Sequence, residues 1–238
     1  MTEIRTAISP EIDRFLDSLV RTGPFASKAE LVRAALVSYA GEAGPMAQGF
    51  DKENIVSPDG RVYQLEYARE SALRGMPGVG LVYEGGVVLA AVTAGAKLVR
   101  GITKIHRIGK DAAVLASGLV ADAFMAVAHA RRAEPRTTEE LVEALVGFYW
   151  GHTVYRWKRP LGAALLVASA LGGNPRLFEI DPSGAFVEYD AAAIGEGSKD
   201  RTEALEKRYR RGKAADAEKL ALDVLGKPAK AEVVHVRA

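Results

Sequence analysis

The chain has 238 residues, of which 48% are hydrophobic and 26% are charged, and its formal net charge is +2. These values are typical of a soluble globular protein of about one or two domains, and the small charge gives no reason to expect a nucleic acid or a membrane as partner. No apolar run approaches the roughly 20 residues of a membrane span, and residues 1–12 lack the apolar stretch of a signal peptide. We therefore expect a cytoplasmic protein without a membrane partner.

Cysteine is absent, which excludes disulfides, a thiol nucleophile and thiolate metal ligands. The four histidines are scattered without the spacing of metal ligands: His106, His129, His152 and His235. We expect no metal site and no cofactor. The many Ala, Arg, Glu and Val residues, with no Cys, are typical of thermophile proteins.

The first forty residues predict one strand and two helices. Polar and apolar residues alternate over 3–8, which indicates a short strand. Ser9 is a suitable N-cap for a helix that begins with Pro10, and Gly23-Pro24 ends that helix. Ser27 and Glu30 have the spacing of a capping box, which starts a second helix.

This strand–helix–helix order over about residues 2–40 resembles the ribbon-helix-helix family of the Arc and MetJ type. Members of that family dimerise through a two-stranded ribbon that enters the DNA major groove. The lone strand here has unpaired edges and the segment is too small for its own core, so pairing with a second copy is expected. The resemblance places three side chains toward the groove and two backbone N–H groups on a phosphate: Glu3, Arg5 and Ala7, and Ser27 and Lys28.

The charge of this module leaves its role open. Residues 1–45 hold five basic and six acidic side chains, whereas DNA binding usually requires a basic surface. Two hypotheses for this module therefore stay open: it binds double-stranded DNA, or it only dimerises. Residues 41–49 contain three glycines and a proline, which predicts a linker between this module, residues 1–40, and a domain of residues 50–238.

The second domain alternates blocks of strands with pairs of helices, which predicts two sheets with helices outside them, in the α+β class. The expected elements are a β-turn at 57–60, helices over 62–70, 119–132, 138–156 (with Thr138 as N-cap), 200–210 and 214–225, two strands within 79–92, and strands over 112–116, 162–170, 176–180, 185–190 and 231–237.

Four ordered motifs give this domain a resemblance: SPDGRVYQLEYARESALRG (57–75), SGLVADA (117–123), RPLGAALLVA (159–168) and PRLFEIDPSGAFVEYDAAAIGEG (175–197). Nearly all of residues 50–238 resembles the α-type subunits of proteasomes, archaeal ones included. The resemblance implies a four-layer α-β-β-α sandwich of the N-terminal nucleophile hydrolase type. It also implies assembly into a homo-oligomeric ring, with proteasome β subunits and an ATPase activator as partners.

The resemblance also predicts that no residue is catalytic. A catalytic subunit of this family needs an N-terminal threonine whose own amine acts as base. Alignment places Met76 at that threonine, Val92 at the acidic position and Glu196 where a serine is usual. Lys104 matches the lysine position, which α-type subunits also keep.

In α-type subunits the counterpart of Lys104 lines a pocket between neighbouring subunits, and this pocket receives the C-terminal carboxylate of an activator. The counterparts of Gly75 and Glu66 lie nearby. A solvated surface lysine is the alternative. The pore-gate residues of archaeal subunits match Phe50, Asp51, Lys52, Pro58 and Tyr67 here. Phe50 lacks a hydroxyl and Lys52 lacks the planar group of arginine, so a normal gate is not expected.

We therefore expect a non-catalytic α-type ring subunit linked to protein degradation, with an N-terminal pairing module over the pore. The alternative is a DNA-binding protein or transcriptional regulator that uses a proteasome-like body as an oligomerisation scaffold. A hydrolase with an unmatched nucleophile is the third hypothesis.

Overall fold

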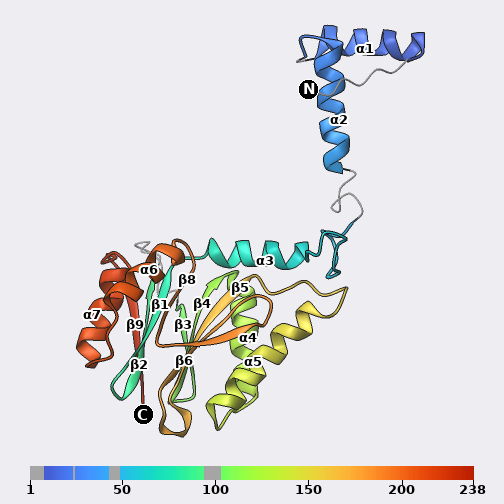
Figure 1. Cartoon of the computed structure of the whole chain (residues 1–238). Coiled ribbons are helices and arrows are strands. Elements are labelled where there is room, and N and C mark those ends of the chain that lie inside the picture. Colours follow the sequence, from blue (N-terminus) through green and yellow to red (C-terminus); the bar gives the residue numbers. More distant parts are fainter. Residues whose placement is uncertain (1–7, 24, 43–48, 94–102) are drawn as a thin grey trace.

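A computed structural model describes residues 8–23, 25–42, 49–93 and 103–238. It confirms both helices of the N-terminal module, α1 (Pro10–Thr22) and α2 (Lys28–Glu42), whereas the strand predicted over 3–8 falls on residues outside this range except for Ile8. The Ser9 hydroxyl caps α1 by accepting the N–H of Ile12 at 3.4 Å. In Figure 1 this helical pair lies beyond one end of α3, away from the sheets.

The start of α2 has the reciprocal bonds of a capping box. The Ser27 hydroxyl accepts the N–H of Glu30 at 3.2 Å, and the Glu30 carboxylate accepts the N–H of Ala26 at 2.8 Å. The return bond thus reaches one residue before the expected one. Helix α2 ends at Glu42, two residues past the module end expected from the sequence.

Two antiparallel sheets form the body. The four-stranded sheet has the order β8-β1-β2-β9, and the five-stranded sheet has the order β3-β4-β5-β6-β7. The strands are β1 (Gly78–Tyr83), β2 (Gly86–Val92), β3 (Ile105–Ile108), β4 (Ala112–Gly118), β5 (Ala163–Ser169), β6 (Arg176–Ile180), β7 (Phe186–Tyr189), β8 (Ala191–Ile194) and β9 (Ala231–Arg237). Strands β3 and β8 were not among the predicted elements, since each has only four residues and neither alternates cleanly.

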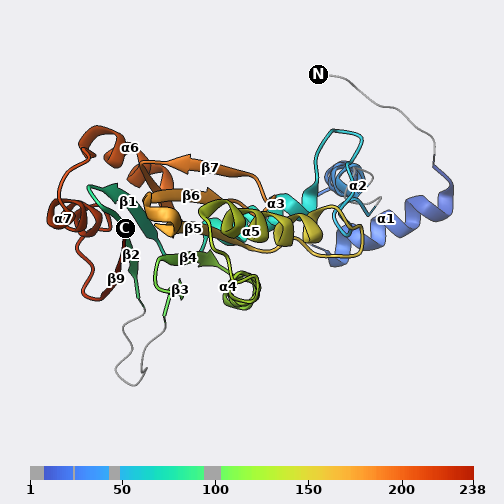
Figure 2. The same ribbon diagram turned by 90° about the horizontal axis from the view of Figure 1, so that it is seen from below.

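Helices cover the outer face of each sheet, so the body has the expected four layers (Figure 2). Helices α4 (Val120–Arg132) and α5 (Thr138–Thr153) pack on the five-stranded sheet. Helices α6 (Ser198–Arg208) and α7 (Ala214–Val224) pack on the four-stranded sheet. A short 3-10 turn, η1 (Leu171–Gly173), connects β5 to β6.

The central strands are buried on both faces, which explains their continuous apolar sequences. On β5, Leu165 points toward α4 and α5 while its neighbour Leu166 points into the space between the sheets, and both are fully buried. Four fully buried leucines belong to the cluster between the sheets: Leu89, Leu115, Leu166 and Leu177.

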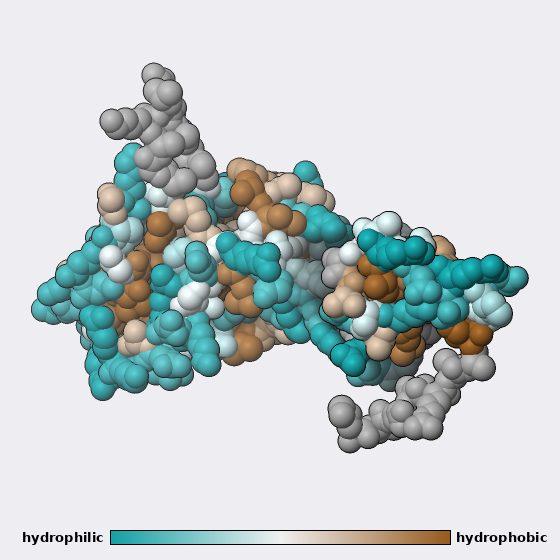
Figure 3. All heavy atoms as spheres, turned by 90° about the horizontal axis from the view of Figure 1, so that it is seen from above, coloured by the Kyte–Doolittle hydropathy of each residue, from teal (hydrophilic) through white to brown (hydrophobic). Residues whose placement is uncertain are grey.

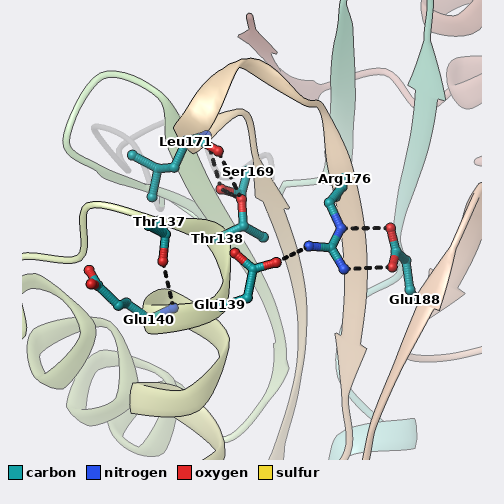
Figure 4. A network of polar contacts seen from close by, with 8 residues as sticks. All are labelled: Thr137, Thr138, Glu139, Glu140, Ser169, Leu171, Arg176 and Glu188. Carbon is teal, nitrogen blue, oxygen red and sulfur yellow. Dashed lines mark hydrogen bonds and ion pairs between the residues drawn. The ribbon is translucent and has the colours of Figure 1, made fainter.

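Helix α5 has a different N-cap from the predicted one, and it ends at Thr153 and not at residue 156. Its N-cap is Thr137, whose hydroxyl accepts the N–H of Glu140 at 3.1 Å, and not Thr138. The Thr138 hydroxyl instead contacts that of the buried Ser169 at 2.8 Å and donates to the carbonyl of Leu171 (Figure 4). Thr138 therefore attaches the first turn of α5 to the sheet.

An arginine at the start of β6 joins three elements of the same region. The Arg176 guanidinium forms two bonds of 2.8 Å with the Glu188 carboxylate on β7 and also pairs with Glu139 on α5 (Figure 4). It lies over the ring of Phe178 as well. These contacts hold the edge strand β7 and the start of α5 together.

Candidate functional site

The positions aligned with catalytic residues meet where α3 (Tyr63–Leu73) leads into β1. The Lys104 ammonium donates to the carbonyl of Met76 at 2.8 Å. The hydroxyl of buried Ser117 lies 3.2 Å from the same oxygen and 3.1 Å from the carbonyl of Ala72. The segment before β1 is thus held by side chains from two later parts of the chain.

Backbone bonds bring the other two aligned positions to the same segment. The N–H of Val92 donates to the carbonyl of Pro77 at 3.1 Å, and the N–H of Glu196 donates to the carbonyl of Gly75 at 2.8 Å. Residues 92, 104 and 196 are therefore all bonded to the short backbone stretch of residues 75–77, which includes Met76.

Lys104 is half-buried, and burial lowers the pKa of its ammonium group to about 8, although the charge of Glu232 opposes the shift. The Glu232 carboxylate does not bind the ammonium directly. It accepts the backbone N–H groups of Lys104 at 2.8 Å and Ile105 at 3.4 Å. Within the described part of the chain, the Lys104 ammonium therefore has a carbonyl oxygen, and no carboxylate, as its hydrogen-bond partner.

Two glycines allow the chain segments to approach this closely. A Cβ atom on Gly75 would lie 2.2 Å from the Ser117 hydroxyl and from the N atom of Gly118. Gly195 has φ of +85°, and a Cβ there would lie 2.5 to 2.8 Å from Ser117, Gly75 and Met76. Both positions require glycine.

A cavity of about 520 Å³ opens beside this segment. Among the described residues its lining includes Gly75 but neither Lys104 nor Glu66: Tyr67, Glu70, Ser71, Arg74, Gly75, Gly118 and Leu119. The Glu66 carboxylate pairs with Arg61, 2.7 Å from its Nε. Of the three residues predicted to share a pocket, the single chain brings Gly75 and Lys104 close to Met76 and leaves Glu66 apart.

The predicted gate positions lie around the start of α3. The carbonyl of Asp51 accepts a bond from Gln64 of α3, and half-buried Phe50 lies in the preceding turn. Pro58 occupies the turn that the N–H of Gly60 closes on the carbonyl of Ser57 at 2.8 Å. Tyr67 is 46% exposed and lines the cavity.

Of the predicted DNA contacts, Glu3, Arg5 and Ala7 lie outside the described residues. Ser27 is the cap of α2, and the Lys28 ammonium lies 2.7 Å from Asp13 and 2.9 Å from Asp17 on α1. These bonds raise the pKa of Lys28. Lys28 therefore joins the two helices, and its charge is neutralised by two carboxylates.

Sequence reasoning did not identify Ser117 and Glu232 as part of the site. Ser117 begins one of the quoted motifs, but its partners are 41 and 45 residues away. Glu232 is 128 residues from Lys104, and no local pattern indicates that contact. Within the described ranges, no three His, Asp or Glu side chains are grouped as metal ligands, and no helix has the length and apolarity to cross a membrane.

Comparisons with known proteins give a consistent result. The family model described as proteasome subunit matches residues 73–234. The chain is 41% identical over 175 residues to the proteasome subunit alpha of Archaeoglobus fulgidus, which covers 68% of this chain and 71% of the relative. It is 41% identical over 182 residues to the proteasome subunit alpha 2 of Haloarcula marismortui, which covers 71% and 75% respectively. The helices α1 and α2 precede the residues matched by the family model.

Proposed function

This chain belongs to the proteasome subunit family and is a subunit of the α type, and we propose that it is a non-catalytic member of a ring that assembles with β subunits for protein degradation in the cytoplasm. The observation that carries the proposal is the environment of Met76. A methionine with peptide bonds on both sides stands where a nucleophile is needed, and Lys104 is bound to its carbonyl oxygen.

Native mass spectrometry of the purified chain, alone and co-expressed with a β subunit, tests this proposal. We expect a ring, and peptide hydrolysis only when the β subunit is present. Hydrolysis of fluorogenic peptides by the chain alone would refute the non-catalytic assignment, and a strictly monomeric chain under both conditions would refute the ring.

We propose further that the region of Gly75 and Lys104 receives the C-terminal carboxylate of an ATPase activator. The 520 Å³ cavity next to Gly75 and the Lys104 ammonium, which is bonded to a carbonyl among the described residues, support this role. Glu66, which is paired with Arg61, would lie at the edge of this binding region and not within the cavity. A Lys104→Ala variant should lose stimulation by the activator. The exposed Lys110 provides the matched control, Lys110→Ala, which should retain it.

For the entrance of the pore, we propose that the N-terminal module replaces the usual gate formed by the counterparts of Phe50, Asp51, Pro58 and Tyr67. The altered residue at position 50 supports this idea, as does a folded helical pair directly upstream. Removal of residues 1–42 should raise the basal peptide hydrolysis of the complex with β subunits. An unchanged rate would argue against a gating role.

The alternative functions concern the same module. Its helices expose large apolar side chains, with Ile12 at 50%, Phe15 at 62% and Leu36 at 52%, and Figure 3 shows apolar surface on the helical pair. Of the side chains described in α1 and α2, only Leu31 is buried. Exposed apolar surface of this extent favours self-pairing. Because Lys28 is neutralised by Asp13 and Asp17, DNA binding has less support.

The substitution Phe15→Glu should separate these alternatives. We expect it to remove pairing between modules while leaving the body folded, as judged by native mass spectrometry. A gel shift with double-stranded DNA at low salt that is lost in an Arg5→Ala variant would favour the DNA-binding alternative instead.

A further inference from the structure

The chain that links α6 to α7 carries a dense run of positive charge. Residues 207–213 contain five basic side chains and no acidic one, and all five are exposed: Lys207, Arg208, Arg210, Arg211 and Lys213. We call residues 207–213 the basic segment. In Figures 1 and 2, α7 lies at the opposite end of the molecule from α1 and α2, so the basic segment belongs to the body and is separate from the N-terminal module.

Two contacts fix the path of the basic segment along the body. The Tyr209 hydroxyl donates to the carbonyl of Val82 at 2.8 Å, and the carbonyl of Gly212 accepts the N–H of Glu84 at 2.9 Å. Both partners belong to β1 or to the turn that follows it. The basic side chains are therefore presented on a backbone of defined path, which lowers the entropic cost of binding.

Four of the five cations have no carboxylate partner in the part of the chain that the structure describes. Arg208 is the exception, because its guanidinium lies 2.9 Å from the Asp223 carboxylate. Exposed arginines elsewhere on the body do form such pairs, as Arg156 does with Glu53. A surface that gathers unpaired cations attracts an anionic partner.

Helix electrostatics account for only part of this charge. Lys207 and Arg208 stand in the last turn of α6, where cations complement the negative end of the helix dipole. Lys213 is the N-cap residue of α7, where a cation faces the positive end of the dipole. The charge of Lys213 is therefore unfavourable for the isolated fold, and an anion bound beside it would remove this cost.

Two hollows that border the basic segment show which acidic groups lie close to it. The first, of about 340 Å³, has three basic and two acidic side chains in its lining: Arg208, Arg210, Lys219, Asp216 and Asp223. The second, of about 410 Å³, is lined by Arg211 and Asp190, which form no ion pair with each other. The carboxylates weaken the positive field, but an excess of basic groups remains, to which Lys219 adds.

The side chains around the basic segment favour a chain of phosphates over a folded protein as its partner. From residue 198 to residue 230, all of which are described, no large hydrophobic side chain is exposed, whereas protein interfaces usually have apolar anchors. The same stretch has no exposed aromatic ring on which an unpaired base could stack. Guanidinium groups bind phosphate through two parallel hydrogen bonds. These properties fit contacts to the backbone of a duplex.

We propose that the basic segment, together with Lys219, binds the phosphate backbone of a double-stranded nucleic acid without regard to its base sequence. This surface lies on the body, so the inference goes beyond the proposed function and does not depend on the ring. Copies joined in a ring would bind the duplex with greater avidity.

Fluorescence anisotropy with a labelled DNA duplex of mixed sequence tests the proposal on the full chain. In the double variant Arg210→Gln, Arg211→Gln, we expect the affinity at about 100 mM salt to fall about ten-fold, and the slope of log K against log salt concentration to become shallower by about 2. The matched control Lys110→Gln, Arg132→Gln removes two exposed charges elsewhere on the body and should change the affinity less than about two-fold. Equal losses in the two double variants, or no binding by the parent, would overturn the proposal.

A gain in affinity is a result that a folding defect cannot produce. Asp216→Asn removes an exposed carboxylate from the hollow that Arg210 lines, and it should strengthen duplex binding about two-fold. An unchanged or weaker affinity would overturn the proposal. Because all the substituted side chains are exposed, each variant should keep the circular dichroism spectrum and melting temperature of the parent.

Competitors identify the kind of polyanion that the surface prefers. At equal concentration of charge, unlabelled duplex should displace the labelled duplex several-fold more effectively than polyglutamate or inorganic polyphosphate, since the duplex presents its phosphates on a rigid frame. Equal displacement by polyglutamate would show that charge alone is bound. Stronger displacement by inorganic polyphosphate would assign the surface to a free phosphate chain. Either result would overturn the proposal.

The remaining outcomes separate this inference from the proposed functions. If Arg5→Ala releases the duplex and the double variant at Arg210 and Arg211 does not, the N-terminal module holds the DNA and the inference is overturned. If the chain stays monomeric and binds the duplex through Arg210 and Arg211, the ring proposal fails and the inference stands.

Discussion

The ammonium group of Lys104 donates a hydrogen bond of 2.8 Å to the carbonyl oxygen of Met76, across 28 residues of sequence. We propose that Met76 stands where a catalytic subunit of this family would carry its threonine. In this chain the Lys104 ammonium holds the backbone of Met76 and thereby stabilises the segment before β1.

The lowered pKa of Lys104 predicts how the stability of the protein depends on pH. Because the folded-state pKa is about 8 and the ordinary value is 10.5, the unfolded chain binds more protons between these values, and stability rises with pH there. The stability that the folded chain gains when Lys104 loses its proton is complete above about pH 10.5, and it is lost as the pH falls through about 8. In Lys104→Met, the gain in free energy of unfolding between pH 7 and 9.5 should be smaller by about 1 kcal/mol, allowing for solvent screening.

Chemical denaturation of the parent and of Lys104→Met at both pH values provides the measurement. Other groups that titrate in this range are common to the two proteins, so the difference between them isolates Lys104. Identical pH dependence would show that Lys104 is no more difficult to charge in the folded chain than in the unfolded one.

The ion pair between Asp122 and Arg159 should contribute strongly to stability. Burial by itself raises the pKa of Asp122, but Arg159 and the N–H of Gly162 more than offset this, and the net shift is downward. Arg159→Met would leave a carboxylate that is only 2% exposed without its cation. We expect a loss of about 1–3 kcal/mol, since the arginine itself is partly exposed.

The exposed pair of Arg156 and Glu53 is the control. Urea titrations of both variants measure the difference, and Arg156→Met should cost below about 1 kcal/mol. Equal effects of the two substitutions would mean that the buried carboxylate of Asp122 is adequately satisfied by the N–H of Gly162.

Glycine at position 195 should be indispensable for the site. In Gly195→Ala the new Cβ would lie 2.5 Å from the Ser117 hydroxyl, and the φ of +85° is unfavourable for alanine. We expect a loss of about 3 kcal/mol or more, or failure to fold. Gly147, inside α5 with open space around it, is the matched control. Gly147→Ala should stabilise the protein by up to about 1 kcal/mol, and thermal unfolding would measure both.

The two threonines at the start of α5 should differ in their roles (Figure 4). Thr137→Ala removes an N-cap and should cost about 1 kcal/mol. Thr138→Val keeps the shape of the side chain but removes the contact with the buried Ser169 hydroxyl, which should cost about 1–3 kcal/mol. The Ser169 oxygen also accepts the N–H of Leu171 at 3.3 Å, so Thr138→Val leaves only the Ser169 O–H without its partner. Non-additive losses in the double-mutant cycle of Thr138→Val and Ser169→Ala would assign the loss to the contact between the two hydroxyls, and additive losses would assign it to packing.

Local patterns predicted the N-terminal helices and the last strand well. Ser9, Pro10 and Ser27 act within three or four residues of their own position, so their effect is readable without knowledge of the fold. The end of α5 was predicted three residues too late. Asn54, about 100 residues earlier in the chain, binds the carbonyl of His152 in the last turn of this helix and that of Tyr155 just after it, and such contacts leave no trace in the local pattern.

The sequence by itself determined the family, the α+β class, the order of most elements and the identity of the residues at positions 76, 92, 104 and 196. These features depend on spacing, caps and motifs that are encoded within short stretches of chain. Only the tertiary structure decided that Lys104 binds the carbonyl of Met76, that Ser117 and Glu232 support the same segment, and that Tyr209 anchors the basic segment to the carbonyl of Val82. These relationships depend on the path of the chain through two sheets, which brings residues 28 to 128 positions apart into contact.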